Sequence, residues 1–471
     1  MSDSDTETRP VSEDEGEGLE PHHDRDNRLT PDFVDAVLDH VEDGDAEGAR
    51  ELVRPLHPAD VADLFELVPG DRREALAGAL AELLDGDVLA EMNDWVRDEV
   101  LRALEPAQVA ALATELDTDD AVAIIEDMDE DEQRAVLRAL DPDDRAAIEE
   151  ALSYPEESAG RLMQRDLVAV PEHWRVGDVL DYLRRTDGLT NDFWEIFVVD
   201  ERHHPVGTCK LSWLLRTPAK IPLGDVMQRE QTLIPVDMDQ EEVALRFQKY
   251  ALISAAVTDD SGRLVGMITV DDVVHIIQEE AGEDVLALSG AGDGDINEPI
   301  LFTVRTRLLW LVVNLGTAII AASVVGLFQG EIAKFALLAV LMPIVSGMGG
   351  NAGTQTLAVI VRALATNQLT SSNTWRMIAR EFRIAAANGG SLGLLIGLGT
   401  FLLYHNPMLA LTIGMAMLIN NLIAGLAGVL IPIGLDSARV DPAVSSAVFV
   451  TMCTDCMGFF SFLGLASLLL V

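Results

Sequence analysis

Asp455 is the residue whose surroundings point most directly to chemistry. It is the only charged residue in the stretch 442–471, which is otherwise strongly apolar and long enough to cross a bilayer as a helix. A carboxylate inside such a span costs about 2.5–3.5 kcal/mol, so it normally faces water or a partner. Because the stretch offers no positive charge, we predict that Asp455 binds a permeating cation. The alternative is a buried carboxyl group that is hydrogen-bonded to Thr451 or Thr454 of its own helix.

A second polar group interrupts another apolar stretch, residues 335–361. Here a proline is followed within a few residues by glycines and amides: Pro343, Gly349, Gly350, Asn351, Gly353 and Gln355. The pattern predicts a broken or kinked helix whose carbonyl groups line protein or water. Close helix packing through small residues is the alternative, and both can hold together. We interpret Cys453 and Cys456, one helical turn apart, as packing residues because no histidine lies nearby to complete a metal site.

The elements that position these residues are membrane spans. Uncharged stretches cover residues 308–328, 335–361, 384–435 and 442–471, and the third is long enough for two helices, with the break at Tyr404–Pro407. The region 301–471 is therefore predicted to be a five-helix α transmembrane domain, embedded in lipid. Arginines lie in alternate loops, which places those loops in the cytoplasm. We expect a multi-pass protein of the cell membrane with a cytoplasmic N-terminus and an extracellular C-terminus.

The formal net charge of −46 is unevenly distributed. From Thr303 onward eight basic residues outnumber five acidic ones, so the first 302 residues carry the whole acid excess. Lysine is scarce beside arginine, a composition typical of a haloarchaeal protein that works at high salt. Most acidic residues are therefore expected to be solvated surface. With no basic face to neutralise phosphates, nucleic acid is excluded as a partner.

Residues 29–157 show short amphipathic helical patterns without strand-like alternation. A weak repeat starts at His57, Glu105, Asp117 and Asp141, and in three of the four copies proline follows directly, at the first helical position. We predict an all-α superhelical N domain here, preceded by a disordered acidic tail over residues 1–28.

Residues 158–275 predict an α/β segment that repeats itself. Gly160–Arg165 recurs 64 residues later as Gly224–Arg229. The segment resembles a tandem pair of CBS modules, which usually act as sensors. Gly266–Asp272 is similar to the pattern of nucleotide-binding CBS pairs, and this resemblance implies that Thr269 and Asp272 contact a nucleotide such as ATP. A plain strand-to-helix turn is the alternative.

Over almost its whole length the chain resembles the MgtE family of magnesium channels. The motifs that carry the resemblance are Pro343 to Gln355, Arg362–Ala365, Asp441–Ala443 and Thr454–Gly458. The resemblance implies a homodimer with its pore on the two-fold axis, where Asp455 of both chains holds a hydrated Mg²⁺.

The resemblance also implies regulatory Mg²⁺ sites. A plug helix and linker are expected over residues 272–300, and the matching acidic positions are Asp272, Glu280, Glu283 and Asp284. Their N-domain partners are expected around Asp117–Asp120, with Asp119 and Asp120 as candidates, and Asp441 matches a further aspartate at the cytosolic end of the last span. The sequence departs from the family at His275, where an acidic ligand is expected, and in the glycine-rich linker Ser289–Asp295.

Our hypothesis is a Mg²⁺ channel that cytosolic Mg²⁺ holds shut by bridging the acidic faces of N domain, CBS pair and plug. At about 1 M salt the Debye length is only about 3 Å, so direct coordination must do the switching. The alternatives are a channel for Co²⁺ or Mn²⁺, and a membrane-anchored nucleotide sensor. The sequence holds no nucleophile–base constellation or phosphate-cradling loop, so we predict that the protein is not an enzyme.

Overall fold

The computed structural model describes residues 22–25, 28–126, 128–186, 189, 193–289 and 296–470. The chain divides into two compact units, Met1–Val273 and Val274–Val471. Nearly all of the predicted acidic tail and residues 290–295 of the predicted linker lie outside the described residues.

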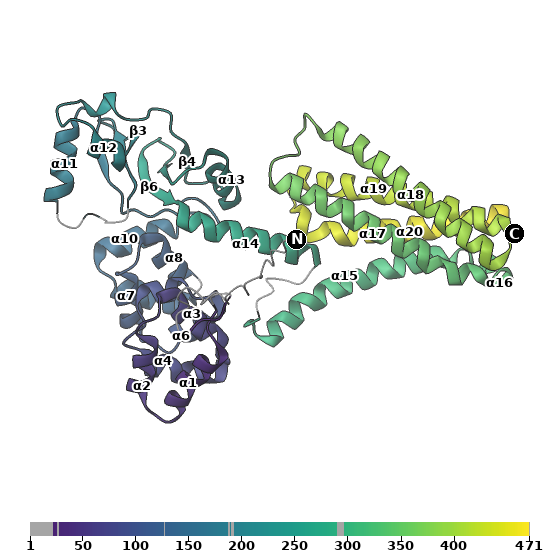
Figure 1. The fold of residues 1–471 in the computed structure, drawn as a ribbon, viewed down its shortest axis with the longest axis horizontal. Helices are drawn as coiled ribbons and strands as arrows, with labels where there is room; N and C mark the ends of the chain where they lie inside the picture. The colour runs from purple at the N-terminus through teal and green to yellow at the C-terminus, as the bar shows by residue number, and fades with distance from the viewer. Residues whose placement is uncertain are drawn as a thin grey trace, which may run out of the picture. The chain divides into compact units, whose positions relative to one another are not determined.

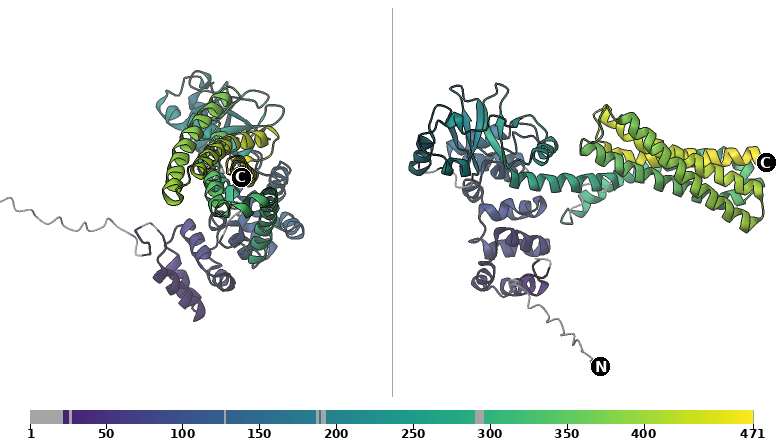
Figure 2. Two further views of the ribbon diagram at one scale, coloured as in Figure 1. Left: turned by 90° about the vertical axis from the view of Figure 1, so that its right-hand side faces the viewer. Right: turned by 45° about the horizontal axis from the view of Figure 1, so that its top comes forward.

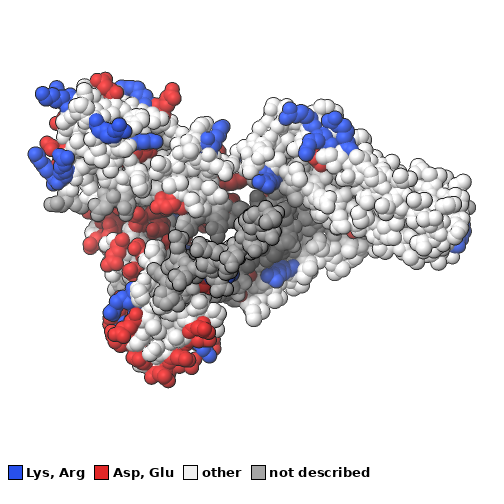
Figure 3. Space-filling view, viewed as in Figure 1, with Lys and Arg blue, Asp and Glu red and all other residues white. Residues whose placement is uncertain are grey.

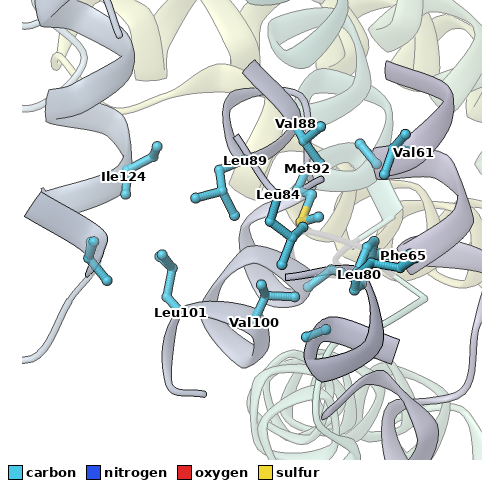
Figure 4. Packing of buried hydrophobic residues seen from close by; sticks show 14 of the residues in the cluster. Val61, Phe65, Leu80, Leu84, Val88, Leu89, Met92, Val100, Leu101 and Ile124 are labelled. Carbon is cyan, nitrogen blue, oxygen red and sulfur yellow. The ribbon is translucent and has the colours of Figure 1, made fainter. Parts of the chain in front are cut away.

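The first unit begins with short helices only, as predicted. Proline occupies the first position of the helices that start at Pro58, Pro106 and Pro142. The helix bounds are Pro31–Glu42 (α1), Ala46–Val53 (α2), Pro58–Leu67 (α3), Gly70–Leu80 (α4), Gly86–Ala90 (α5), Asp94–Leu101 (α6), Pro106–Ala113 (α7), Thr118–Glu126 (α8), Glu130–Ala139 (α9) and Pro142–Ala151 (α10). One continuous apolar core runs between them, and Figure 4 shows part of it, with Phe65, Leu80 and Leu89 fully buried. The all-α N domain is confirmed.

Side chains from one helix cap the carbonyl end of the preceding helix in this domain. Arg73 of α4 donates to the Phe65 carbonyl of α3 at 3.0 Å, Gln133 of α9 to the Ile125 carbonyl of α8 at 3.1 Å, and Arg145 of α10 to the Leu137 carbonyl of α9. In each case the donor lies eight residues after the acceptor. These bonds satisfy carbonyl groups that a helix end leaves without partners, and they fix the angle at which consecutive helices stack.

The α/β segment consists of two three-stranded sheets with the same topology, in the orders β1-β2-β3 and β4-β5-β6. In each sheet the first strand pairs parallel to the second, and the second pairs antiparallel to the third. The bounds are Ala169–Pro171 (β1), Val176–Arg185 (α11), Glu195–Val199 (β2), Pro205–Lys210 (β3), Leu211–Arg216 (α12), Leu233–Pro235 (β4), Gln240–Tyr250 (α13), Ser254–Thr258 (β5) and Leu264–Thr269 (β6).

The repeated motif of this segment links each half to the other. Gln164, from the first copy, forms a bridge with Met267 of β6, and Gln228, from the second copy, forms a bridge with Thr208 of β3. Glycine faces each crossing, because a Cβ at Gly207 would lie 2.8 Å from the Gln228 carbonyl oxygen and one at Gly266 would lie 2.9 Å from that of Gln164. Each copy of the motif therefore pairs with the last strand of the other half of the segment.

The described part of the second unit contains five helices that are long and apolar enough to cross a membrane, as predicted. They are Ile300–Gly326 (α15), Leu337–Ala365 (α17), Thr374–Tyr404 (α18), Pro407–Ser437 (α19) and Pro442–Leu469 (α20), with a short helix Gln329–Lys334 (α16) between the first two. The predicted break at Tyr404–Pro407 is confirmed, since His405 ends α18 and Asn406 caps α19. Figures 1 and 2 show α17 to α20 running alongside one another, and Figure 3 shows that the surface of this part of the molecule is mostly uncharged between its two ends.

A broken or kinked helix was predicted at Pro343, and the break is wrong, because α17 continues as one helix to Ala365. Pro343 lies early in α17 and removes a single N–H donor there. The glycines that follow serve packing on one face. A Cβ at Gly349 would lie 2.0 Å from Asn420 Nδ2, and one at Gly353 would lie 2.6 Å from Val450 Cγ1. Small residues therefore let α19 and α20 approach α17 closely.

The helix-end caps generate a stability prediction. Arg73→Met should lower the free energy of unfolding by about 2–3 kcal/mol, because it leaves the Phe65 carbonyl and the Glu99 carboxylate without a buried guanidinium partner. Calorimetry of the full chain measures the loss. The matched control is Arg72→Met, next to it, which removes a solvent-exposed ion pair to Glu42 and should cost less than about 1 kcal/mol. Equal losses in the two variants would show that the caps add no stability.

Candidate functional site

Asp455 lies midway along α20 and is half-buried. Its Oδ1 accepts a short hydrogen bond from the hydroxyl group of Ser346 on α17. The bonds to Thr451 or Thr454 that the sequence allowed are not made, since these hydroxyls donate to the backbone carbonyls of Ala447 and Thr451. Ser346 was not among the predicted site residues, although it lies inside the motif Pro343 to Gln355. The carboxylate thus gains one neutral donor from another helix, and its Oδ2 has no hydrogen-bond partner among the described residues.

A groove of about 160 Å³ lies on the N-terminal side of Asp455 along α20. The α20 residues that line it are Val444, Ala447, Val448 and Thr451, which recur with helical spacing on the face that leads from Asp455 towards Asp441. Trp310 and Asn314 of α15 form another wall. The groove is closed by Ala287, Leu288 and Ser289, the last residues of helix α14 (Val270–Ser289).

The end of α14 is packed against the membrane helices rather than left free. Ala287 and Leu288 contact an apolar cluster formed by Leu357 and Val361 of α17 and by Ala443 and Val450 of α20. Asp441 starts α20, and its carboxylate accepts a hydrogen bond from the Ala443 N–H at 2.7 Å while remaining exposed. The end of α14, the start of α20 and the groove therefore form one local structure.

The second face of α17 is polar and uncovered in the single chain. Asn351, Thr354 and Gln355 are exposed, and a Cβ at Gly347 or Gly350 would meet nothing within 4 Å. Exposed amides at membrane depth are costly in lipid, so such a stripe normally faces water or protein. Of the predicted motif, Gly349 and Gly353 hold helices together, whereas Gly350, Asn351 and Gln355 lie on this open face. Thr454 is fully buried and does not face it.

In the first unit, three of the predicted metal-binding residues come together. Asp119 and Asp120 lie in the first turn of α8, and Asp272 lies in the first turn of α14. Burial, and then repulsion from Asp272, raise the pKa of Asp119 well above its ordinary value. The same two causes raise the pKa of Asp120 to about 6. Asp119 Oδ1 is buried without a hydrogen-bond partner in the described part of the chain, so this cluster concentrates negative charge that the described contacts leave uncompensated.

The cluster is not a closed metal cage. In the described residues, no three or more His, Cys, Asp and Glu side chains are placed to hold a metal ion together. The carboxylates also lie in the first turns of α8 and α14, and the N-terminal end of a helix favours anions over cations. Mg²⁺ usually keeps several waters and uses one or two carboxylates, so Asp119 Oδ1 is the atom that would accept a hydrogen bond from a water of such an ion.

The other predicted regulatory positions follow on α14. Glu280 is half-buried and Glu283 and His275 are exposed, in the part of α14 that belongs to the second unit. The side chain of Asp284 lies outside the described residues.

The predicted nucleotide-contacting residues bond to each other. Thr269 Oγ1 donates to Asp272 Oδ2 at 2.7 Å, and Gln164 Nε2 approaches the same hydroxyl at 3.5 Å. Asp272 Oδ2 also accepts a hydrogen bond from the Thr269 N–H at 3.4 Å, as the acidic residue of a capping box does at the start of a helix. These bonds agree with the simpler interpretation of the motif as a strand-to-helix turn.

Comparisons with known proteins match most of the chain. Family models match residues 342–465 (MgtE, divalent cation transporter), 56–157 (MgtE intracellular N domain), and 159–211 and 223–279 (CBS domain). A magnesium transporter MgtE of Enterococcus faecalis is 33% identical over 89% of this chain and 93% of its own length. One of Thermus thermophilus is 30% identical over 92% of this chain and 98% of its own length.

A solved structure is also similar to the first part of the chain. It is the cytosolic domain of the Mg²⁺ channel MgtE in complex with ATP, with 30% identity, a TM-score of 0.47, and coverage of 52% of this chain and 99% of that one.

The raised pKa of Asp120 gives a pH-dependent prediction. A carboxyl group whose pKa rises from 3.8 to about 6 on folding stabilises the folded state at low pH. That contribution is lost as the pH rises from about 4 to about 6. Asp120→Asn should therefore raise the free energy of unfolding by about 1–3 kcal/mol at pH 7.5 in EDTA, and have little effect at pH 4.

The control for this prediction is Asp143→Asn, which removes the same charge from the exposed first turn of α10. Thermal unfolding of both variants in EDTA and in millimolar Mg²⁺ measures the effect. If Asp120→Asn lowers the unfolding temperature at pH 7.5 without Mg²⁺, the carboxylates do not repel as described.

Proposed function

Because the chain belongs to the MgtE family, whose model is described as a divalent cation transporter, we propose that it carries Mg²⁺ across a membrane through a path that passes Asp455. The relatives that it matches are named magnesium transporters, and in our proposal this chain is a transporter and not an enzyme. The observation that carries the proposal is the position of Asp455, a carboxylate on an apolar spanning helix with a single neutral partner, Ser346.

The chemistry of this site suits a hydrated ion. Mg²⁺ gives up its waters reluctantly and is often held through one or two carboxylates. Ser346 uses one oxygen of Asp455 and leaves the other for a water of the hydrate. Carboxylate and hydroxyl ligands also accept Co²⁺ and Mn²⁺, so these ions are the competing cargo.

The pore lies between two copies of the chain in our proposal. The polar stripe of Asn351, Thr354 and Gln355 is exposed in one chain, and lipid chains cannot form hydrogen bonds with these side chains. A second copy, related by a two-fold axis, would bring a second Asp455 towards the same ion. Loops bearing Arg305 and Arg307, Arg362 to Arg383, and Arg439 then face the cytoplasm, and the C-terminus faces outward.

Cytosolic Mg²⁺ closes this path. The end of α14 fills one side of the groove between Asp455 and Asp441, so a shift of α14 changes access to it. The start of the same helix carries Asp272, next to Asp119 and Asp120. A Mg²⁺ ion that binds these carboxylates in the closed arrangement more tightly than in the open one favours closure. Glu280, Glu283, Asp284 and Asp441 are the further regulatory or pathway carboxylates of this proposal.

The nucleotide-sensing alternative makes a different demand. It requires ATP to contact Thr269 and Asp272, which in this structure bond to each other beside a strongly acidic cluster. ATP titration of the purified protein in the presence and absence of Mg²⁺, combined with flux measurements, separates the two. Tight ATP binding without any ion flux would favour a sensor.

We predict that Asp455→Asn abolishes Mg²⁺ uptake into liposomes that contain the reconstituted protein. The neutral amide keeps the size of the side chain but loses the charge that attracts the cation, and a loss of at least about 100-fold is expected. Asp436→Asn is the matched control, because it removes one carboxylate from the exposed end of α19 and should leave uptake unchanged. Wild-type flux in Asp455→Asn would remove Asp455 from the path.

Closure by Mg²⁺ is tested through the accessibility of α14. Millimolar Mg²⁺ should slow protease cleavage within residues 270–289 by at least about tenfold, even in molar KCl, because direct coordination survives screening that long-range repulsion does not. Asp119→Asn combined with Asp120→Asn should lose this protection. Cleavage that is insensitive to Mg²⁺ in the wild type would rule out the closing mechanism.

A further inference from the structure

Asn420 is a polar residue at the centre of the membrane bundle that the proposed ion path does not use. It lies midway along α19 and is fully buried. Its Nδ2 donates to the backbone carbonyl of Val345 on α17 at 2.8 Å. Val345 immediately precedes Ser346, the residue that bonds to Asp455.

The side chain of Asn420 fits between two glycines on two different helices. A Cβ on Gly349 of α17 would lie 2.0 Å from Asn420 Nδ2, and a Cβ on Gly458 of α20 would lie 2.8 Å from the same atom. Gly458 follows Asp455 by three residues, about one turn along α20. The amide therefore occupies a space that both neighbouring helices leave open, at the level of the Ser346–Asp455 pair.

This placement has an energetic cost. Asn420 Oδ1 is buried and has no hydrogen-bond partner in the described part of the chain. Such an acceptor destabilises the folded state relative to one that is hydrogen-bonded. An apolar side chain of similar size would avoid the cost, so packing alone does not account for an amide here.

We propose that Asn420 is a positioning residue for the ion site, a role that rests on the proposed function of Asp455. Its amide fixes the α17 backbone next to Ser346 and spaces α17 from α20, so that the Ser346 hydroxyl meets the Asp455 carboxylate in one geometry. A carboxylate held in this way presents its second oxygen to the hydrated ion in a fixed direction. Small displacements of such groups reduce the strength of binding sharply.

Asn421 supplies a matched comparison. It follows directly in α19, is equally buried, donates to the Met417 carbonyl of its own helix, and also has an unpartnered Oδ1 within the described chain. Its Cβ faces Gly389 of α18 instead of α17 and α20. A change at Asn421 therefore alters the same bundle at the contact between α19 and α18.

The experiment measures Mg²⁺ uptake into liposomes as a function of Mg²⁺ concentration, together with the ratio of Mg²⁺ to Co²⁺ flux and the thermal stability of each variant. Asn420→Ala should raise the half-saturating Mg²⁺ concentration at least tenfold and lower the flux ratio. Asn421→Ala should leave both within about twofold of the wild type, even where it lowers the unfolding temperature.

A double variant separates positioning from packing. Asn420→Ala with Gly349→Ala puts a methyl group into the space that the amide leaves, so it should recover stability relative to Asn420→Ala without recovering the Mg²⁺ concentration dependence. Recovery of both, or unchanged ion dependence in a folded Asn420→Ala, would overturn the inference while leaving transport by the wild type intact. Absence of Mg²⁺ flux in the wild type would instead overturn the proposed function.

Discussion

A carboxylate placed halfway along an apolar helix constrains the arrangement of the whole membrane half. Its insertion costs free energy that only water, a donor or a cation can offset. Asp455 obtains its donor from Ser346 on α17, and α17 can approach α20 because glycine stands where the helices cross. The glycine motif and the aspartate, more than 90 residues apart, are therefore parts of one structure. The glycines allow α17 and α20 to approach, and this approach brings the Ser346 hydroxyl to the Asp455 carboxylate.

The glycines of α17 divide into two groups with different surroundings. Gly349 and Gly353 meet Asn420 and Val450, so a side chain there would push helices apart. Gly347 and Gly350 meet nothing within 4 Å, and they lie beside exposed amides. One face of α17 thus belongs to the core of the chain, and the other is the face that we propose lines the ion path. One motif can serve both faces because residues three or four positions apart in an α-helix lie on the same side. Gly349 and Gly353 therefore share one face, and Gly347 and Gly350 share another.

The elements that the sequence predicts correctly are those whose signal is local. Proline at Pro58, Pro106 and Pro142, the repeated segment at Gly160 and Gly224, and the uncharged stretches each specify an element through residues that are close in sequence. Features that depend on tertiary packing could not be predicted from the sequence. Three features depend on how the helices pack against one another: whether Pro343 breaks α17, which donor meets Asp455, and the position of Asn420 between two helices. Hydrophobic periodicity within one helix contains no information on its register against another.

Burial separates the acidic residues that we propose to be regulatory from the many solvated ones. The chain has 79 acidic residues, and composition alone does not distinguish regulatory carboxylates from surface ones. Asp119, Asp120 and Asp272 differ because two helix starts bring them together, away from bulk water, where screening by salt is weak. Repulsion between exposed carboxylates is weakened by high ionic strength, whereas repulsion between desolvated ones persists. A response to Mg²⁺ that survives high salt must therefore depend on the few carboxylates that the fold has desolvated, and the surface charge contributes solubility instead.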